Sequence, residues 1–198
     1  MNKTVFISYS WAEPSGGIVN NWLKPSLKNA GIDVSVDKDD CHYQDSIEQY
    51  EQEIGNADKI IAVVSRPYLE SINCMYEMAL IFEKGGELNN RLYFVGIEKV
   101  QSIEDIINFW NKALVDVQND MIGKAILQPY EKKKRKVDLI LKHLGDFLDY
   151  WEDINRMDFS KVSEENFKVL TNIVIDRTNE AEMSKENLML TNPPLSNN

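Results

Sequence analysis

The sequence is poor in the residues that build metal sites and disulfide frameworks. Its 198 residues include only two cysteines, Cys41 and Cys74, and two histidines, His42 and His143. Two thiols do not make a disulfide framework in a chain of this length, which favours a reducing, cytoplasmic environment. So few ligand-type side chains predict no metal site.

Basic residues and long apolar runs are also scarce. Asp and Glu number 32 against 22 Lys and Arg, a net charge of −10. This excess argues against nucleic acid and anionic membranes as partners, since both reward cations. The one basic run, Lys132 to Lys136, is interpreted as the start of a solvated helix. No apolar stretch approaches the roughly 20 residues of a membrane span, and the strand-like N-terminus does not resemble a signal peptide.

Several sequence motifs of nucleotide-binding and hydrolytic α/β proteins are missing. The segment after the first expected strand, SYSWAEPSGG, has no GxGxxG, so a dinucleotide-binding domain is excluded. No phosphate-binding GxxxxGK[ST] and no nucleophile-elbow GxSxG occur anywhere. A response-regulator receiver needs an aspartate at the end of its third strand, where this chain has Ser65 and Arg66.

What the sequence does contain is an alternation of strand and helix patterns. Three helix patterns separate the strands. They cover residues 18–30, 46–54 and 71–82, and the first has a kink or break at Pro25 and ends at Gly31. Strands separated by helices predict a parallel sheet with helices on both faces. The expected strands are 4–9, 32–36, 59–65, 91–97 and a short fifth at 125–127.

The second half of the chain is predominantly helical by pattern. A further helix is expected from Ser163, and the chain from Glu180 onward lacks periodicity, as a tail or linker does. Two apolar stripes predict long amphipathic helices that cover the core: Ile103, Ile106, Ile107, Trp110, Leu114, Val117 and Met121 in the first, and Val137, Ile140, Leu141, Leu144, Phe147, Leu148 and Trp151 in the second.

The most informative stretch is Asp58 to Leu80, in which a buried strand leads into a helix capped by Ser71. Cys74, Met78, Ile81 and Phe82 share the apolar face of that helix, Glu83 points the opposite way, and Glu77 lies on the border between the faces. A border glutamate commonly solvates a helix edge. Above the carboxyl ends of parallel strands it can instead face a ligand crevice. Here those ends hold residues 8–11, 37–45 and 65–77, and both interpretations of Glu77 remain open.

Five segments in order resemble the Toll/interleukin-1 receptor (TIR) domain family, and its bacterial branch best: FISYS (6–10), GIDVSVD (31–37), DSI (45–47), DKIIAVVSRPYLES (58–71) and CMYEMA (74–79). The resemblance implies a flavodoxin-like, three-layer α/β fold with a central parallel sheet of four to five strands and extra C-terminal helices. It also implies a TIR domain over residues 1–150, a helical extension over 151–179 and a flexible tail or linker over 180–198.

The resemblance implies site residues as well. Glu77 matches the glutamate with which TIR enzymes cleave NAD⁺, and Tyr9, Ser10 and Trp11 match the loop that lines the nucleotide pocket. Asp37 matches the acidic residue that ends the second strand and opens the BB loop, here 37–45, and it is assigned to the NAD⁺-binding pocket as well.

Two positions depart from the family pattern. Asn73 stands where many NAD⁺-cleaving members have tryptophan, and Gln44 where many have glycine. Asn73 is thus assigned to the substrate pocket, and Asp39, Tyr43 and Gln44 to a loop that assembles neighbouring domains.

The function that follows from the resemblance is NAD⁺ cleavage in a bacterial antiphage immune system, giving ADP-ribose or a cyclic isomer. NAD⁺ is the substrate, and no cofactor is expected. Expected partners are NAD⁺, other TIR domains, and a fused or downstream sensor or effector. Two alternatives stay open: a non-catalytic TIR scaffold that assembles through its BB loop, and a nucleotide-binding α/β domain of another kind.

Overall fold

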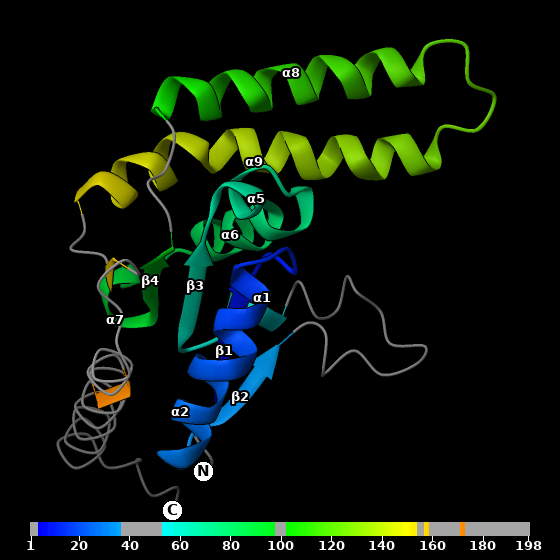
Figure 1. Ribbon diagram of the computed structural model, residues 1–198. Helices are drawn as coiled ribbons and strands as arrows, with labels where there is room; N and C mark the ends of the chain where they lie inside the picture. Colours follow the sequence, from blue (N-terminus) through cyan, green and yellow to red (C-terminus); the bar gives the residue numbers. More distant parts are fainter. Residues whose placement is uncertain (1–3, 37–52, 98–101, 154–156, 159–170, 173–198) are drawn as a thin grey trace, which may run out of the picture.

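The computed structural model describes residues 4–36, 53–97, 102–153, 157–158 and 171–172. All strands are parallel, and they lie in the order β2-β1-β3-β4-β5 (Figure 1). The predicted α/β class with a parallel sheet of four to five strands is confirmed. The strand bounds are β1 (Thr4–Tyr9), β2 (Asp33–Val36), β3 (Ile60–Val64), β4 (Leu92–Gly96) and β5 (Met157–Asp158).

The predicted fifth strand at 125–127 is wrong. These residues form the loop between two long helices, where Ile126 is 68% exposed. A strand needs a hydrogen-bonding neighbour, and this loop lies away from the sheet. The fifth place belongs to β5, which pairs Met157 with Val95 and Asp158 with Gly96.

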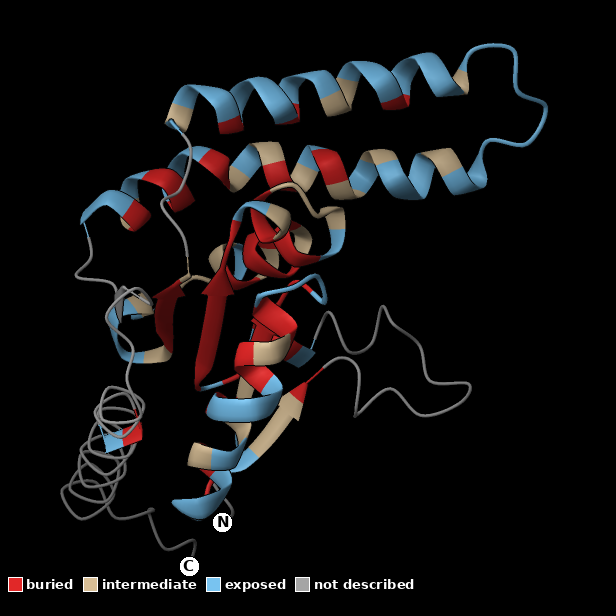
Figure 2. Cartoon of the chain, viewed as in Figure 1, coloured by how far each residue is buried: buried red, intermediate tan, exposed pale blue. Residues whose placement is uncertain are grey.

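Helices cover both faces of the sheet, because the side chains of its central strands alternate between two apolar clusters. In β3, Ile60, Ala62 and Val64 belong to one cluster, and Ile61 and Val63 to the other. All residues of β3 and β4 are buried (Figure 2). The first cluster packs against α5, α6, α8 and α9, and the second against α1, η1 and α2.

The first helical segment changes geometry along its length, as Pro25 predicts. It consists of α1 (Ser15–Ile18), a π-helical turn η1 (Val19–Leu23) and α2 (Lys24–Asn29). Gly31 ends it with φ +75°. Within this segment Ile18, Leu23 and Leu27 are buried, whereas Trp22 is 49% exposed.

Two serines cap the helices that follow β3. Ser65 Oγ accepts from Tyr68 N at the start of α5 (Arg66–Leu69), and Ser71 Oγ accepts from Cys74 N at the start of α6 (Ile72–Lys84). The predicted cap of α6 is confirmed, and α6 runs two residues beyond its predicted end. Of the helix predicted over 46–54, residues 53 and 54 are described. They are helical, and the helix continues to residue 56. The short α7 (Leu88–Arg91) leads into β4.

A long helical hairpin follows β4. It consists of α8 (Ile103–Met121) and α9 (Gln128–Asp153), which pack side by side and project beyond the sheet (Figure 1). The predicted stripes are largely buried, but Ile107 is 38% exposed. No helix in the described part of the chain is long and apolar enough to cross a membrane.

The helix α9 has an unusual order of charges. After Glu131 it opens with the run Lys132 to Lys136, and its last turn contains no basic residue. The boundary predicted at residue 150 falls inside α9, and Trp151 belongs to the first apolar cluster. Of the helix predicted from Ser163, only residues 171–172 are described, and they are helical. The predicted tail lies outside the described residues.

Candidate active site at the ends of β1 and β3

Glu77 lies in the second turn of α6 and is only 6% exposed. Its Oε2 accepts a 2.6 Å hydrogen bond from Ser8 Oγ. Ser8 is the penultimate residue of β1 and is itself buried. This burial excludes the interpretation in which Glu77 solvates a helix edge. A short bond to a carboxylate in a dry environment is among the stronger hydrogen bonds in proteins.

Tyr68 extends this contact into a chain of three side chains. Its Oη lies 2.9 Å from Ser8 Oγ, inside the core. A serine hydroxyl has one proton, and Ser8 gives its proton to Glu77, so Tyr68 must be the donor to Ser8. Burial raises the pKa of Tyr68 well above its usual value, and the nearby Cys74 and Glu77 raise it further, against a lowering by the Ser8 hydrogen bond. Tyr68 therefore remains a neutral donor, and the chain of donors ends on the Glu77 carboxylate.

The three residues meet where the strand order reverses. From β1 the chain passes to β2 on one side, whereas β3 lies on the other side of β1. Two contacts join the end of β1 and the helix after it to the segment that follows β3. Ser15 Oγ donates to Ser65 Oγ at 3.2 Å, and Cys74 Sγ donates to the Tyr9 carbonyl oxygen at 3.6 Å. Crevices at such switch points are the usual ligand sites of open α/β sheets.

The loop after β1 supplies one exposed aromatic ring. Trp11 is 60% exposed, so it is not buried in the core. Ser10 is buried, and its Oγ accepts from Ala12 N at 3.3 Å. The side chain of Tyr9 belongs to the second apolar cluster, on the face of the sheet opposite Ser8. The structure therefore brings the Tyr9 carbonyl, but not its ring, to the side of Glu77.

The other predicted site residues lie elsewhere. Asn73 is exposed one turn before Glu77, and its Oδ1 accepts from Lys136 Nζ of α9 at 3.3 Å. The ammonium group of Lys136 also lies 4.7 Å from the ring centre of Tyr76. This contact ties Asn73 to the hairpin. The loop residues Asp37, Asp39, Tyr43 and Gln44 lie outside the described residues.

Sequence reasoning missed Ser8 and Tyr68 as members of the site. A serine inside an otherwise apolar strand was the available signal for Ser8, because a buried hydroxyl needs a partner. Tyr68 carried no such signal, since a tyrosine near a buried strand is ordinary core composition.

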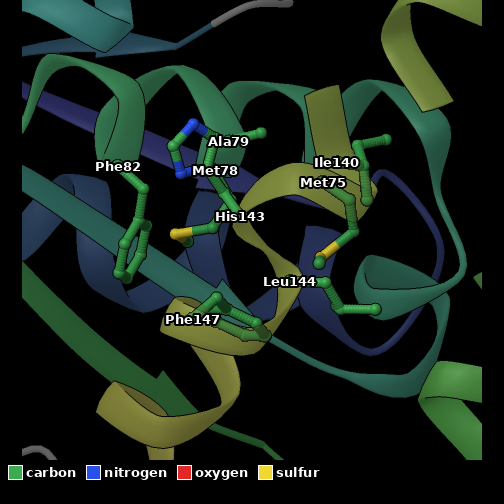
Figure 3. Close-up of a pocket in the computed structure, with 8 residues that line it drawn as sticks. All are labelled: Met75, Met78, Ala79, Phe82, Ile140, His143, Leu144 and Phe147. Atoms are coloured by element: carbon green, nitrogen blue, oxygen red, sulfur yellow. The ribbon is translucent and has the colours of Figure 1, made fainter. Parts of the chain in front are cut away.

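Other features of the described residues do not form a second site of this kind. Figure 3 shows a pocket between α6 and α9, and Glu77 is not among the residues that line it. The pocket leaves no room for a water molecule, and its lining is almost wholly apolar, so it is a packing seam. Within the described segments, no group of three His, Cys, Asp or Glu side chains is arranged to hold a metal ion.

Comparisons with known proteins agree with this architecture. The TIR domain family model matches residues 5–123. Among solved structures, the chain resembles the TIR domains of the activated Roq1 resistosome that directly recognises the pathogen effector XopQ. The TM-score is 0.54 at 16% identity, over 87% of this chain and 99% of that chain. This likeness shows the fold alone. No curated protein matches the sequence. Because the family match spans more than half of its residues, the chain belongs to the TIR domain family.

Proposed function

We propose that this chain is an NAD⁺ glycohydrolase of a bacterial antiphage immune system, with Glu77 as its catalytic carboxylate. The observation that carries the proposal is the buried Glu77, held by Ser8 at the switch point of the sheet. The reaction takes NAD⁺ as substrate and needs no cofactor. The cytoplasm, where NAD⁺ is available, is the proposed location.

One carboxylate is sufficient for this chemistry. Nicotinamide in NAD⁺ is a pyridinium cation and departs as a neutral base, so it needs no proton from a general acid. Ordinary glycosidases use a second carboxyl group for that protonation. An ionised Glu77 stabilises the oxocarbenium-like ribose by its charge. Attack by water then gives ADP-ribose, and attack by a group of the same molecule gives a cyclic product.

The direct test is turnover of NAD⁺ by the purified chain. The protein is incubated with NAD⁺ over a series of protein concentrations, with and without a crowding agent, and the products are separated by chromatography. We expect nicotinamide together with ADP-ribose or a cyclic isomer in equal amount. NAD⁺ that stays intact at every concentration would refute the proposal.

A second candidate function is a non-catalytic scaffold for TIR–TIR assembly. The observation that favours it is the hydrogen bond from Lys136 to Asn73, at the position where many enzymes of the family have tryptophan. A chain that self-associates but leaves NAD⁺ intact in the same concentration series would establish this alternative.

We expect Ser8→Ala to lower kcat for NAD⁺ cleavage about 10-fold to 100-fold, with a smaller change in KM. A hydrogen bond to a charged group contributes about 1.5–3 kcal/mol, and Ser8 orients Glu77 without reaching the substrate. Tyr68→Phe should have a smaller effect on kcat, because it removes only the hydroxyl group that donates to Ser8. Ser8→Thr keeps the hydroxyl and should recover most of kcat. If Ser8→Ala lowered the melting temperature but left kcat unchanged, Ser8 would have only a structural role.

We expect Trp11→Ala to raise KM for NAD⁺ about 10-fold while the melting temperature stays within roughly 2 °C. Stacking of an aromatic ring on a base contributes about 1–3 kcal/mol, and a side chain that is 60% exposed contributes little to the core. Steady-state kinetics and thermal unfolding of the same preparation provide the measurement. Trp22→Ala, also at an exposed tryptophan, is the matched control and should leave KM unchanged. An unaltered KM in Trp11→Ala would remove Trp11 from the pocket.

A further inference from the structure

Exposed hydrophobic side chains are concentrated in the α8–α9 hairpin. Six of the eight large hydrophobic residues exposed in the described part of the chain lie between positions 107 and 127. Scattered exposed hydrophobics are ordinary, but a cluster on one projecting element indicates an interaction surface. The six are Ile107, Phe109, Val115, Ile122, Ile126 and Leu127.

Three of these residues belong to one stripe of α8. Ile107, Asn111, Val115 and Gln118 recur at intervals of four, four and three residues, and Ile122 follows at the C-cap. At 3.6 residues per turn they share one face of the helix, and all five are exposed. The residues of α8 that face the core are Ile106, Trp110 and Val117, all buried. The stripe is therefore exposed along its length, and most of the α8 ribbon is pale blue in Figure 2.

The spacing of the stripe is self-complementary. Ile107 precedes Val115 by eight residues, and Ile122 follows it by seven. If two copies of α8 pack antiparallel about an axis between Leu114 and Val115, Ile107 of each copy comes opposite Ile122 of the other, and the two Val115 side chains lie one position apart across the axis. Asn111 then meets Gln118, so amide groups lie opposite amide groups and can hydrogen-bond. One register thus pairs every member of the stripe with a residue of like chemistry.

Charge agrees with the same orientation. Residues 119–136, around the end of the hairpin, hold six basic and two acidic residues, a net charge of +4. The whole chain carries −10, so the remainder carries −14. At the other end of α8, the first turn holds the exposed Glu104 and Asp105. In this register Glu104 comes within one position of Lys124 of the second copy.

We propose that two copies of this chain dimerise through the exposed stripe of α8, antiparallel and about a twofold axis between Leu114 and Val115. Such an interface is isologous, so each contact away from the axis occurs twice. An anionic membrane would attract the basic end of the hairpin, but it would cover Ile122 and leave Ile107 and Val115 in water. A second copy covers all three. The proposal does not depend on whether Glu77 is catalytic.

Sedimentation velocity of the full chain over a concentration series tests the dimer. We expect the wild-type mass to rise to that of a dimer, and Val115→Glu to weaken dimerisation at least 100-fold, because two glutamates would lie side by side at the axis. Trp22→Glu makes the same charge change at a side chain of similar exposure outside the hairpin, and it should dimerise like the wild type. Circular dichroism establishes that both variants are folded. A wild-type chain that stays monomeric, or a dimer that survives Val115→Glu, would overturn the proposal.

A charge exchange tests the register. Glu104→Lys and Lys124→Glu should each weaken dimerisation about 10-fold, since two surface pairs are lost in each case, and the double variant should recover it. A double variant no tighter than either single variant would overturn the antiparallel register.

Flotation with phosphatidylserine vesicles tests whether the stripe binds a membrane instead. If the wild-type chain remained monomeric, bound these vesicles and lost that binding in Ile122→Glu, the stripe would be a membrane-binding surface instead of a dimer interface.

Discussion

Replacement of Glu77 by glutamine is expected to reduce nicotinamide release from NAD⁺ by about a thousandfold or more while the protein stays folded. Glutamine has nearly the same volume and can still accept the Ser8 hydrogen bond, but it lacks the charge that stabilises an oxocarbenium ion in a dry site. Single-turnover and steady-state assays of nicotinamide release, together with thermal unfolding, measure both parts of this expectation.

The matched control is Glu83→Gln, on the same helix. Glu83 is exposed and contacts Lys142 and His143 of α9. Hydrogen bonds from Lys142 and then His143 lower the pKa of Glu83, so it is ionised at neutral pH and its replacement also removes a full charge. We expect wild-type turnover in this variant. Equal losses in both variants, or none in Glu77→Gln, would show that Glu77 is not the catalytic carboxylate.

The largest expected effect on stability is that of Trp110→Ala, which should lower the free energy of unfolding by about 3–5 kcal/mol. Trp110 is wholly buried, and its Nε1 donates to the Leu69 carbonyl oxygen of α5 at 3.0 Å. Truncation leaves a cavity between the hairpin and the core, and it also removes the donor to a buried carbonyl. Urea denaturation followed by circular dichroism gives the value.

Two variants show which part of this loss comes from the cavity. Trp110→Phe keeps most of the apolar volume but loses the indole donor, so a loss of about 1–2 kcal/mol is expected. Trp22→Ala removes the same side chain at a site that is 49% exposed and should cost less than about 0.5 kcal/mol. If Trp110→Ala were as stable as Trp22→Ala, α8 would not be anchored through Trp110.

The strands and the long helices could be predicted because their signals are local. The β-branched run that became β3, and the Ser71 cap of α6, each depend on residues next to one another in the chain. The π turn before Pro25 was not predictable in the same way. The hydrophobic spacing of residues 18–30 fits an α-helix, and it carries no local signal for a π-helical turn.

The candidate site was only partly predictable. Family resemblance selected Glu77, but spacing alone left it on the border of a helix. Its burial results from contact with Ser8, which is 69 residues away in the sequence, and Tyr68 approaches Ser8 across 60 residues. Such pairings are set by the register of β1 against β3, and no local pattern specifies that register.

The order of charges along α9 bears on how the chain folds. Cations near the start of a helix and anions near its end both oppose the helix macrodipole. Residues 128–153 are thus poorly suited to form a helix as an isolated peptide, and α9 depends on the apolar surfaces of α6 and α8 that flank it. Both of those helices precede it in the chain, so during synthesis α9 emerges from the ribosome after the surfaces that hold it. The hairpin is therefore completed after the part of the core that it covers, rather than acting as the folding nucleus.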